Sequence, residues 1–347
     1  MEKIKIAING FGRIGRSAFK AVTGNLNASM VPSTNLAPND FELVAINDLT
    51  PVESLAYLLK YDSVYGRFDK TVSYNRSSLT VNGKTYKIFA EKDPERLPWK
   101  DLEVDVVLEC TGYFTEYKAA KAHIIAGSKR VVISAPGKGD EGDIQVFGTE
   151  KINKKIEDLI ISNASCTTNS IAPVMQILED NFGVEKSLMT TVHSYTATQN
   201  IVDGPNKDPR RGRAGAANII PTTTGAAAAT VKAIPSLKNK FDGIALRVPT
   251  LCGSISDITT LLKEGASPEE INQTFERAKH MPLYEGILET SKEPLVSSDI
   301  LGLPYSGIID LSSTKVIGGN LAKVLVWYDN EWAYSIRLVS IAKKLFL

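Results

Sequence analysis

In the first part of the chain, short apolar runs alternate with apolar residues at helical spacing. The runs predict buried strands, and the spaced residues predict helices between them. Such alternation is typical of an α/β fold with a parallel, doubly wound sheet, whose ligands lie at the carboxyl ends of the strands. Residues 79–81 and 85–89 flank Asn82-Gly83, which predicts a β-hairpin. Strands are expected near residues 3–8, 43–48, 104–109 and 130–134, and helices near residues 16–22, 51–60 and 119–126.

Further along, the pattern changes to longer strands with fewer helices between them. Strands are expected near residues 186–194, 243–249 and 255–263. They predict a second domain of α+β type with a mostly antiparallel sheet. The end of the chain, residues 334–347, has the apolar spacing of an amphipathic helix, which we expect to pack on the first domain. The expected domains are residues 1–165, joined by a C-terminal helix at residues 331–347, and residues 166–330.

Composition narrows the class of protein. A chain of 347 residues is long enough for two domains, and its 40 basic and 39 acidic residues leave a formal charge of +1. This balance favours neither a nucleic acid nor a membrane as partner. Cys110, Cys166 and Cys252 are far apart and lack metal-site spacing, so we expect a reducing compartment and no metal. We expect a cytoplasmic protein, since the chain enters a strand without a signal peptide and has no membrane-spanning apolar run.

A glycine motif follows the first predicted strand. Gly10, Gly12 and Gly15 form G-x-G-x-x-G between that strand and a helix, the context of a Rossmann dinucleotide site. A glycine at the first position permits a tight turn, the second lets backbone approach a pyrophosphate, and the third lets helix and strand pack closely. The pyrophosphate would lie on the helix N-terminus. An ordinary glycine-rich turn has the same pattern, so the motif needs an acidic residue after the next strand.

Asp48 supplies that acidic residue. Its distance from the glycines exceeds the usual ~20 residues, and the excess is the polar segment at residues 25–40, interpreted as a loop insertion. A carboxylate here would accept hydrogen bonds from the adenosine ribose and repel a 2′-phosphate. No arginine directly follows Asp48. The pattern therefore favours NAD over NADP, and the insertion could alter cofactor access or a subunit contact.

One cysteine stands among small polar residues, at the predicted start of a helix. Ser165 or Asn163 can cap this helix, which places Cys166 in its first turn, where the helix dipole favours a thiolate. His193, in a later polar motif, is a candidate base with a pKa near neutrality. A buried, inert cysteine is an equally good interpretation of this pair alone. The cluster at residues 210–213 fits either a phosphate-binding loop or an ordinary solvated loop.

Taken together, these motifs resemble the phosphorylating glyceraldehyde-3-phosphate dehydrogenases over nearly the whole chain. The family implies an NAD-binding Rossmann domain, a catalytic domain and a glycolytic homotetramer. Its reaction turns D-glyceraldehyde 3-phosphate, NAD and inorganic phosphate into 1,3-bisphosphoglycerate. The motifs that carry the resemblance are residues 8–16, 164–169, 193–199, 220–227, 246–250 and 327–331.

The resemblance also implies roles for individual residues. Cys166 would form a thiohemiacetal and then a thioester, with His193 as base. Residues of the substrate phosphate site would be Thr196, Thr198 and Arg247. The attacking phosphate would be bound by Ser165, Arg211, Thr224 and Gly225, and Thr167 would complete the substrate-binding set. The cofactor would be bound by Gly10, Gly12, Arg13, Ile14, Gly15, Asp48, Thr111, Gly112, Ser134, Asn330 and Tyr334.

Two alternatives and some departures from the family pattern remain. A related enzyme acting on erythrose 4-phosphate shares the nucleophile, and a non-catalytic NAD-binding regulatory protein would share the fold. Ser170 stands where many relatives carry a second cysteine, and residues 251–253 are atypical. His123 and His280 lie outside the motifs, so we expect both at the surface.

Overall fold

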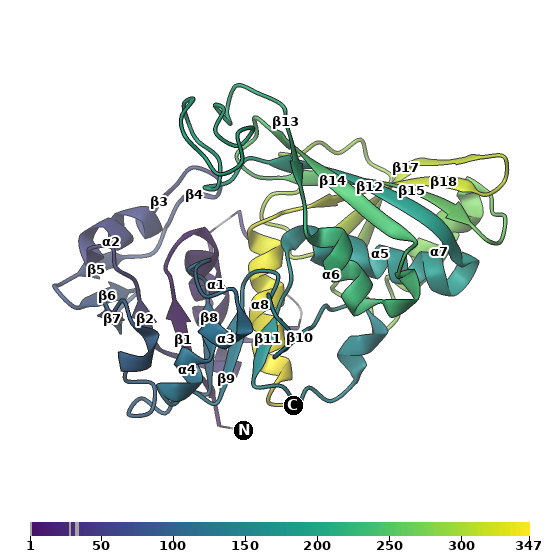
Figure 1. Cartoon of the computed structure of the whole chain (residues 1–347). Coiled ribbons are helices and arrows are strands. Elements are labelled where there is room, and N and C mark those ends of the chain that lie inside the picture. The colour runs from purple at the N-terminus through teal and green to yellow at the C-terminus, as the bar shows by residue number, and fades with distance from the viewer. Residues whose placement is uncertain (1, 28, 32–34) are drawn as a thin grey trace. The chain divides into compact units, whose positions relative to one another are not determined.

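The computed structural model describes residues 2–27, 29–31 and 35–347. The chain forms two compact units (Figure 1). The first unit comprises Met1–Gln145, Lys155–Ala164 and Tyr334–Leu347, and the second comprises Val146–Lys154 and Ser165–Ala333. Among the residues described, no helix combines the length and apolar character that crossing a membrane requires.

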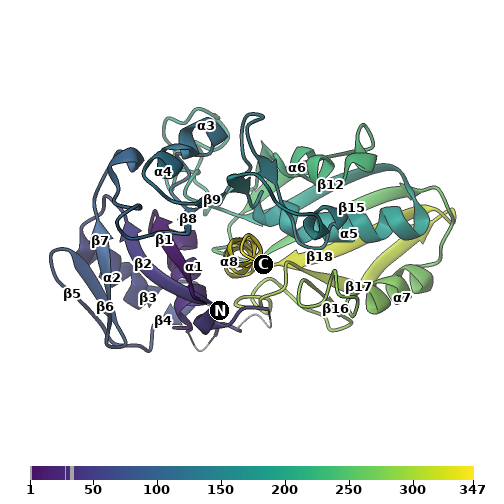
Figure 2. The same ribbon diagram turned by 90° about the horizontal axis from the view of Figure 1, so that it is seen from below.

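The first unit is built on a sheet with strand order β10-β11-β9-β8-β1-β2-β7-β6-β5. Figure 2 labels its strands from β9 to β5. Neighbours from β10 to β7 are parallel, and β7, β6 and β5 are antiparallel. The strands are β1 (Ile4–Asn9), β2 (Phe41–Asn47), β5 (Val72–Tyr74), β6 (Ser78–Val81), β7 (Lys84–Phe89), β8 (Val106–Glu109), β9 (Arg130–Ile133), β10 (Asp143–Ile144) and β11 (Ile160–Ser162), with β3 (Tyr61–Asp62) and β4 (Gly66–Arg67) pairing separately. The unit's helices are α1 (Arg13–Thr23), α2 (Val52–Lys60), α3 (Tyr117–Ala120), α4 (Ala122–Ile125), the short helices η1 (Pro38–Asp40) and η2 (Pro94–Arg96), and most of α8 (Trp332–Lys344).

This parallel sheet confirms the doubly wound fold expected from the sequence. The run Ile6, Ala7 and Ile8 in β1 has no exposed surface, as a strand covered on both faces requires. The predicted hairpin is present, because Asn82 (φ 49°) and Gly83 (φ 81°) adopt the left-handed conformation that a tight two-residue turn needs. The helix expected near residues 119–126 is instead divided into α3 and α4.

The second unit is built on a sheet with strand order β13-β14-β12-β15-β18-β17-β16. It is mostly antiparallel, as expected, although β12 pairs with β14, and β16 with β17, in parallel. The strands are β12 (Val184–Ser194), β13 (Ile220–Thr223), β14 (Phe241–Val248), β15 (Ser254–Leu262), β16 (Leu288–Ser291), β17 (Gly307–Ile317) and β18 (Leu321–Tyr328). The helices are α5 (Cys166–Phe182), α6 (Ala226–Ala233) and α7 (Pro268–Ala278), with the short helices η3 (Glu150–Asn153) and η4 (Pro235–Leu237).

Two features of the second unit place polar side chains close together. Helix α5 begins at Cys166 because the Ser165 side chain accepts a hydrogen bond from the Thr168 amide, an N-cap of the predicted kind. His193 of β12 and Arg247 of β14 are partners in the register of neighbouring strands. The start of α5 and the ends of these strands carry the residues described next.

Candidate functional site

Cys166 and His193 lie together in the second unit. The Cys166 Sγ is 3.4 Å from the His193 Nε2. The other ring nitrogen, Nδ1, is 2.6 Å from the Ser194 carbonyl oxygen, which can only accept a hydrogen bond. When Nδ1 donates to that oxygen, Nε2 presents its lone pair to the thiol. This is the arrangement of a nucleophile and a base.

Burial and positive charge set the protonation of this pair. Burial of His193, whose side chain is 4% exposed, lowers its pKa, and the Arg247 guanidinium lowers it further, to about 3. Burial also raises the pKa of the Cys166 thiol, although Arg247 and the Thr167 amide oppose that shift. Both directions are opposite to the thiolate and the near-neutral imidazole pKa expected from the sequence. Burial thus opposes the thiolate that the helix N-terminus favours, and it disfavours a charged imidazole.

Two arginines make this site attractive to anions. The Arg247 Nη1 is 2.8 Å from His193 Nδ1 and donates to the Ser194 carbonyl at 3.0 Å. Burial lowers the pKa of Arg247, and repulsion from Arg211 lowers it further. A bound anion would relieve that repulsion. Guanidinium groups are the donors that phosphate oxygens prefer.

The threonines predicted to bind phosphate lie in two groups. The hydroxyls of Thr196 and Thr198, just beyond the end of β12, are 2.9 Å apart. Arg211 donates to the Thr222 hydroxyl at 2.9 Å and to the Thr223 carbonyl at 3.3 Å, next to Thr224. Gly225 follows at the start of α6, where an added Cβ would meet no atom within 4 Å. Arg211 thus lies close to open space at a helix N-terminus.

Tyr328 was missed by sequence reasoning. Its hydroxyl, in the buried interior, lies 2.9 Å from the Thr167 hydroxyl and 2.7 Å from that of Thr191, and its ring packs edge-on against His193. The sequence feature that could have identified Tyr328 is its place in the 327–331 motif, which also contains Asn330. The Thr167 hydroxyl is engaged by this tyrosine, which links the start of α5 to the strand that carries His193.

Asn330 is held in one orientation. Its Oδ1 accepts hydrogen bonds from the Ser194 hydroxyl (2.9 Å), the Gly253 amide (3.0 Å) and the Ser254 hydroxyl (3.0 Å). The Cys252 thiol is 3.6 Å from the same oxygen and donates to Asp329 at 3.3 Å. The Oδ1 of Asn330 is therefore occupied by donors of the protein, and its Nδ2 is the atom that can donate to a ligand. Cys252 and Gly253, from the segment that is atypical in sequence, take part in this arrangement.

The glycine motif of the first unit has the geometry that a dinucleotide requires. An added Cβ at Gly15 would lie 2.0 Å from the Gly10 carbonyl oxygen, and one at Gly10 would lie 2.7 Å from the Thr111 nitrogen. At Gly12 an added Cβ would meet no atom within 4 Å, and this residue caps α1 without a side-chain hydrogen bond. The amides of Arg13 and Ile14 therefore start a helix whose N-terminus is open to an anion.

A cavity of about 690 Å³ lies beside this motif in the first unit. It is lined by Gly10, Gly12, Asp48, Thr111 and apolar side chains such as Phe114. The Asp48 carboxylate accepts from the Phe11 amide at 2.7 Å and from the Thr50 amide at 2.8 Å, which fixes it at the rim. Open glycine backbone, a helix N-terminus and a fixed carboxylate fit a dinucleotide with a free ribose diol.

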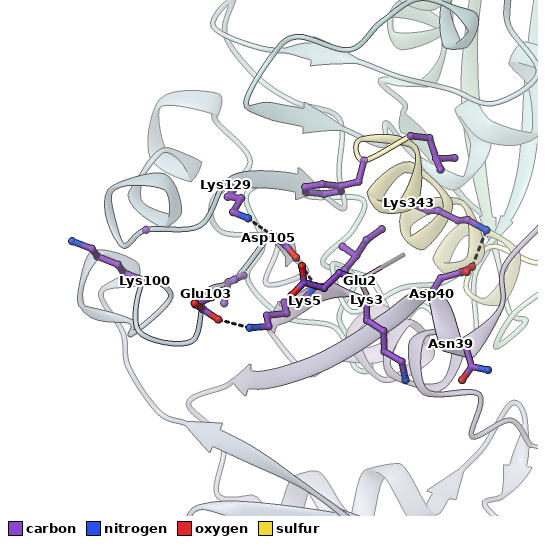
Figure 3. A pocket seen from close by; sticks show the side chains of 15 residues that line it. Glu2, Lys3, Lys5, Asn39, Asp40, Lys100, Glu103, Asp105, Lys129 and Lys343 are labelled. Carbon is purple, nitrogen blue, oxygen red and sulfur yellow. Dashed lines mark hydrogen bonds and ion pairs between the residues drawn. The ribbon is translucent and has the colours of Figure 1, made fainter.

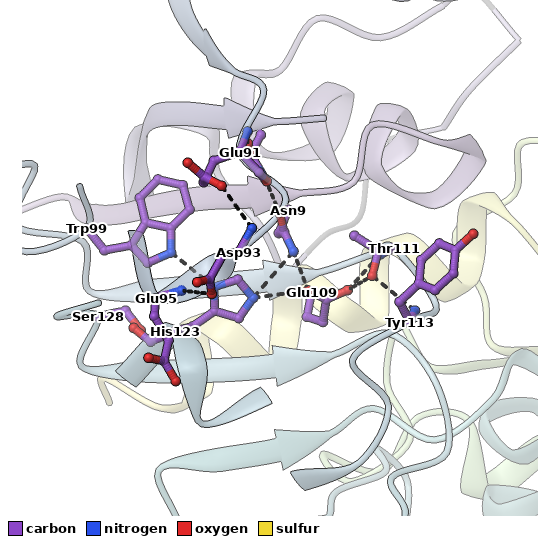
Figure 4. A network of polar contacts seen from close by, with 11 residues as sticks. Asn9, Glu91, Asp93, Glu95, Trp99, Glu109, Thr111, Tyr113, His123 and Ser128 are labelled. Atoms are coloured by element: carbon purple, nitrogen blue, oxygen red, sulfur yellow. Dashed lines mark hydrogen bonds and ion pairs between the residues drawn. The ribbon is translucent and has the colours of Figure 1, made fainter. Parts of the chain in front are cut away.

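A buried polar network supports the carboxyl ends of β1, β2 and β8 beneath this cavity (Figure 4). Glu109 accepts from the Asn9 side chain at 2.6 Å, from the Thr111 amide at 2.7 Å and from the Thr111 hydroxyl. The Trp99 indole donates to His123 Nδ1 at 3.0 Å, so Nε2 carries the hydrogen and donates to Glu109 at 3.0 Å.

The surface position expected for His123 is therefore wrong. Its side chain has no exposed surface, because it lies between Trp99 and Glu109. No pattern in sequence pairs residues so far apart. His280 is exposed, as expected.

The remaining predicted cofactor residues of the first unit are Gly112, Ser134 and Tyr334. Gly112 follows Thr111 and has a φ of 74°. The Ser134 amide donates to the Glu109 carbonyl, and the Tyr334 hydroxyl donates to the Ala164 carbonyl at 3.0 Å.

A second cavity in the first unit, of about 870 Å³, lies near the amino ends of β1, β8 and β9 (Figure 3). Its charges are largely paired with one another. Lys5 pairs with Glu103, Lys129 with Asp105 at 2.7 Å, and Lys343 with Asp40 at 2.8 Å. It lacks the G-x-G-x-x-G motif and the open helix N-terminus found at Gly12, so the smaller cavity is the better dinucleotide site.

Comparison with known proteins agrees with this geometry. Residues 4–117 match the family model "Glyceraldehyde 3-phosphate dehydrogenase, NAD binding domain", and residues 165–330 match the corresponding C-terminal domain. The glyceraldehyde-3-phosphate dehydrogenase of Thermotoga maritima is 49% identical, over 96% of this chain and 97% of its own length. That of Geobacillus stearothermophilus is 48% identical, over 98% and 97%. A glycine loop open to a dinucleotide, a thiol–imidazole pair and these matches together show that the chain is an NAD-dependent oxidoreductase of the glyceraldehyde-3-phosphate dehydrogenase family.

Proposed function

We propose that the protein oxidises D-glyceraldehyde 3-phosphate and phosphorylates the product to 1,3-bisphosphoglycerate, with NAD as cofactor. The observation that carries this proposal is the Cys166 Sγ held 3.4 Å from His193 Nε2, beside Arg247, which is itself repelled by Arg211. A nucleophile, a base and two cationic groups are what acyl transfer between a sulfur and a phosphate requires.

In the first half of the reaction, Cys166 attacks the aldehyde. A bond forms between Sγ and the aldehyde carbon, and the thiol proton passes to the carbonyl oxygen, which gives a thiohemiacetal. The Cys166 amide, in the first turn of α5, is placed to stabilise charge that develops on that oxygen. His193 Nε2 then accepts the hydroxyl proton as the thioester forms. When bound, NAD supplies the acceptor for the hydride lost from this carbon.

In the second half, inorganic phosphate attacks the thioester carbon. The carbon–sulfur bond breaks, Sγ takes up the proton held by His193, and the proton of the phosphate goes to solvent. Ser165, Arg211, Thr224 and the Gly225 amide are the proposed donors to this phosphate. Thr196, Thr198 and Arg247 are the proposed donors to the phosphate of the sugar, and Thr167 holds Tyr328 against the site.

The substrate phosphate has a second role in this proposal. Arg247 helps lower the pKa of His193 to about 3, too low for an effective base near neutral pH. An anion bound to Arg247 offsets the guanidinium charge and raises the pKa of His193. Substrate binding therefore makes the imidazole a better proton acceptor at the moment when it is needed.

The cofactor residues are proposed from the fit of the first unit and from Asn330. The amides of Gly12, Arg13 and Ile14 would bind the pyrophosphate, and Asp48 the adenosine ribose. Gly10 and Gly15 shape the turn, and Thr111, Gly112, Ser134 and Tyr334 would lie along the cofactor. The Asn330 Nδ2 would donate to the carboxamide, since its Oδ1 is occupied by protein donors.

Turnover with and without the acceptor anion tests the proposal. Formation of NADH from glyceraldehyde 3-phosphate should be sustained only with phosphate or arsenate present. C166S should abolish turnover, and H193N should lower it by about 10²–10⁴-fold. Equal sustained turnover without either anion would show thioester hydrolysis instead and would refute the phosphorylating reaction.

Erythrose 4-phosphate remains a second candidate substrate, because the same thiol and base would serve it. The intact second anion site, with Arg211 beside Thr222 and Thr223, favours the phosphorylating reaction. Comparison of kcat/KM for the two sugars decides between them. Complete lack of turnover with retained NAD binding would instead favour a regulatory protein. A homotetramer in the cytoplasm completes the proposal.

A further inference from the structure

Two buried residues of the first unit hold the wall of the cavity of about 690 Å³ without lining it. The wall includes Asn9, Asn47 and Thr111. Glu109 is 2% exposed and His123 has no exposed surface, and both lie behind these residues. Because Glu109 and His123 do not reach the cavity, they act on a ligand only through the groups that they contact.

Hydrogen bonds fix the charge of these two side chains (Figure 4). The Trp99 indole can only donate, so His123 Nδ1 accepts, and the ring is the neutral tautomer with its hydrogen on Nε2. Nε2 donates to Glu109 Oε2 at 3.0 Å, and the Asn9 Nδ2 donates to the same oxygen at 2.6 Å. Glu109 Oε1 accepts from the amide and the hydroxyl of Thr111. A carboxylate has about four lone-pair sites, and these donors occupy them, which leaves no place for a proton on Glu109.

Glu109 takes up both donors of Thr111. The Thr111 amide, at 2.7 Å, and the Thr111 hydroxyl donate to the same carboxylate oxygen. The hydroxyl oxygen itself accepts from the Tyr113 amide at 3.0 Å. Because a hydroxyl oxygen has two lone pairs, Thr111 keeps one acceptor site for a ligand and no donor.

Glu109 also sets the orientation of the two asparagines in the wall. Since the Asn9 Nδ2 donates to Glu109, its Oδ1 is turned toward the Asn47 Nδ2 and accepts from it at 2.7 Å. The same Nδ2 donates to the Glu91 carbonyl at 2.9 Å, and the Asn47 Oδ1 accepts from the Glu91 amide at 2.9 Å. Both hydrogens of the Asn47 amide are thus used within the protein. Asn47 directly precedes Asp48, whose carboxylate lies at the same cavity.

We propose that Glu109 and His123 are positioning residues for the nucleoside half of the cofactor. They hold the wall so that it presents oxygen acceptors, which bind the hydroxyl and amino donors of adenosine. The side chains of Asn47 and Thr111 would offer a phosphate no donor, so the pyrophosphate is left to the open amides at Gly12. The inference rests on the proposed binding of adenosine at this cavity and deepens it.

Binding of NAD and of adenosine to the full-length protein tests this, with adenosine measured by competition with NAD. An amide has one acceptor oxygen, so E109Q leaves donors of the network without a partner and should weaken adenosine and NAD binding by the same factor, about 5–50-fold. KM for NAD should rise, while kcat and the alkylation rate of Cys166 stay within about twofold. G12A, which alters the pyrophosphate site, should weaken NAD binding and leave adenosine binding unchanged. H123Q, which keeps a donor to Glu109, should bind adenosine more tightly than H123A.

Two controls separate positioning from loss of charge and from general loosening of the fold. E95Q removes a carboxylate that is exposed and does not line the cavity. V131A removes two methyl groups from a buried apolar cluster that includes Tyr117 and Ile133. Both variants should bind adenosine and NAD as the unaltered protein does.

Several outcomes would overturn the inference. One is a loss of adenosine binding in V131A as large as that in H123A at the same loss of stability, which would show general loosening. Another is weaker NAD binding with unchanged adenosine binding in E109Q, because the loss would then lie outside the nucleoside half. Unchanged binding of both ligands in E109Q and H123A would overturn it while leaving the proposed activity intact. Failure of adenosine to compete with NAD in the unaltered protein would remove the proposed adenosine site, and the inference with it.

Discussion

At the scale of single residues, the active thiol is governed by burial and by Arg247. Its position at the start of α5 does not make Cys166 acidic, because burial raises the pKa of the thiol more than the nearby positive groups lower it. The same arginine lowers the pKa of the base His193. One guanidinium therefore acts on both partners, favouring thiolate on one side and disfavouring imidazolium on the other.

Removing that guanidinium should raise the pKa of both groups. In R247Q the pKa of Cys166 rises, so the pH profile of its alkylation by iodoacetamide moves to higher pH. At a fixed pH below the pKa of Cys166, a thiolate fraction that is tenfold smaller slows alkylation about tenfold. The pKa of His193 also rises from about 3, which NMR titration can follow. R213Q is the matched control, because Arg213 is exposed and pairs with Asp203. An unchanged pH profile of alkylation in R247Q would contradict the effect of Arg247 on the pKa of Cys166.

Cys166 should also lack a thiol partner on its own helix. Position 170 is a buried serine, whose hydroxyl donates to the Thr167 carbonyl at 3.0 Å. Oxidation by peroxide should therefore produce oxygen adducts at Cys166 and no intrachain disulfide. Intact-mass analysis with peptide mapping checks this. A peptide that links Cys166 to Cys110 or Cys252 would refute it.

At the scale of elements, the β1–α1 turn and the end of β8 form one structure. The glycines allow β1, α1 and the segment after β8 to approach closely, and Glu109 bonds to both Asn9 and Thr111. Glycine is needed at the three positions of the motif for different physical reasons. Gly10 and Gly15 are required by protein atoms, whereas Gly12 borders empty space.

Substitution of two of these glycines should separate stability from binding. G15A places a Cβ 2.0 Å from the Gly10 carbonyl oxygen and should lower the free energy of unfolding by about 1–3 kcal/mol. G12A has room in the free protein, at φ −70°, and should change stability by less than about 0.5 kcal/mol. Its Cβ would enter the pyrophosphate position and weaken NAD binding about 10–100-fold. Urea unfolding measures the change in stability, and NAD titration measures the change in affinity. Normal NAD binding by G12A would contradict the proposed pyrophosphate site.

The buried network should contribute strongly to stability. H123A leaves the Trp99 indole without its acceptor and Glu109 without one of its donors, both in the interior. Leaving a buried donor or acceptor without its partner costs about 1–3 kcal/mol for each group, and more for a charged one. H280A, at an exposed position, should stay within about 0.5 kcal/mol of the unaltered protein in urea unfolding. H123Q should recover part of the stability lost in H123A, because an amide can both accept and donate hydrogen bonds. Equal stability of H123A and H280A would contradict the role of the network.

At the scale of the whole molecule, the second unit exposes several large apolar side chains. Leu188 of β12 and Ile244 of β14 are 67% and 51% exposed, and Ile201, Val202 and Ile219 in the loops before β13 are more than two-thirds exposed. Exposed apolar groups of this number on one unit are typical of surfaces that contact another subunit. They support the homotetramer in the proposed function.

A charge at Leu188 should disrupt assembly. L188E should lower the mass measured by light scattering below that of the unaltered protein, because an unpaired carboxylate cannot be buried at a contact. L159E, at an exposed leucine of the first unit (51%), is the matched control and should keep the full mass. Unchanged mass in L188E would exclude Leu188 from the interface.

Local patterns determined much of the fold and of the candidate site. Apolar patterns predicted strands β1, β2, β6, β7, β8 and β9 of the first sheet and β12, β14 and β15 of the second, but not the other strands. Asn82-Gly83 predicted the hairpin, and Ser165 was correctly expected to cap α5. These features follow from interactions between residues that are near one another in the chain. The motif residues of the site were likewise found because each motif is contiguous.

Tertiary structure alone decided what depends on burial and on distant neighbours. It placed His123 in the interior, made Tyr328 the partner of Thr167, and set the pKa of Cys166 and His193 through burial and Arg247. It also joined the insertion to the loop between β3 and β4, because the Asn27 side chain donates to the carbonyls of Tyr65 and Gly66. Desolvation and charge act through space over a few ångströms, and linear spacing does not record which residues folding brings within that range.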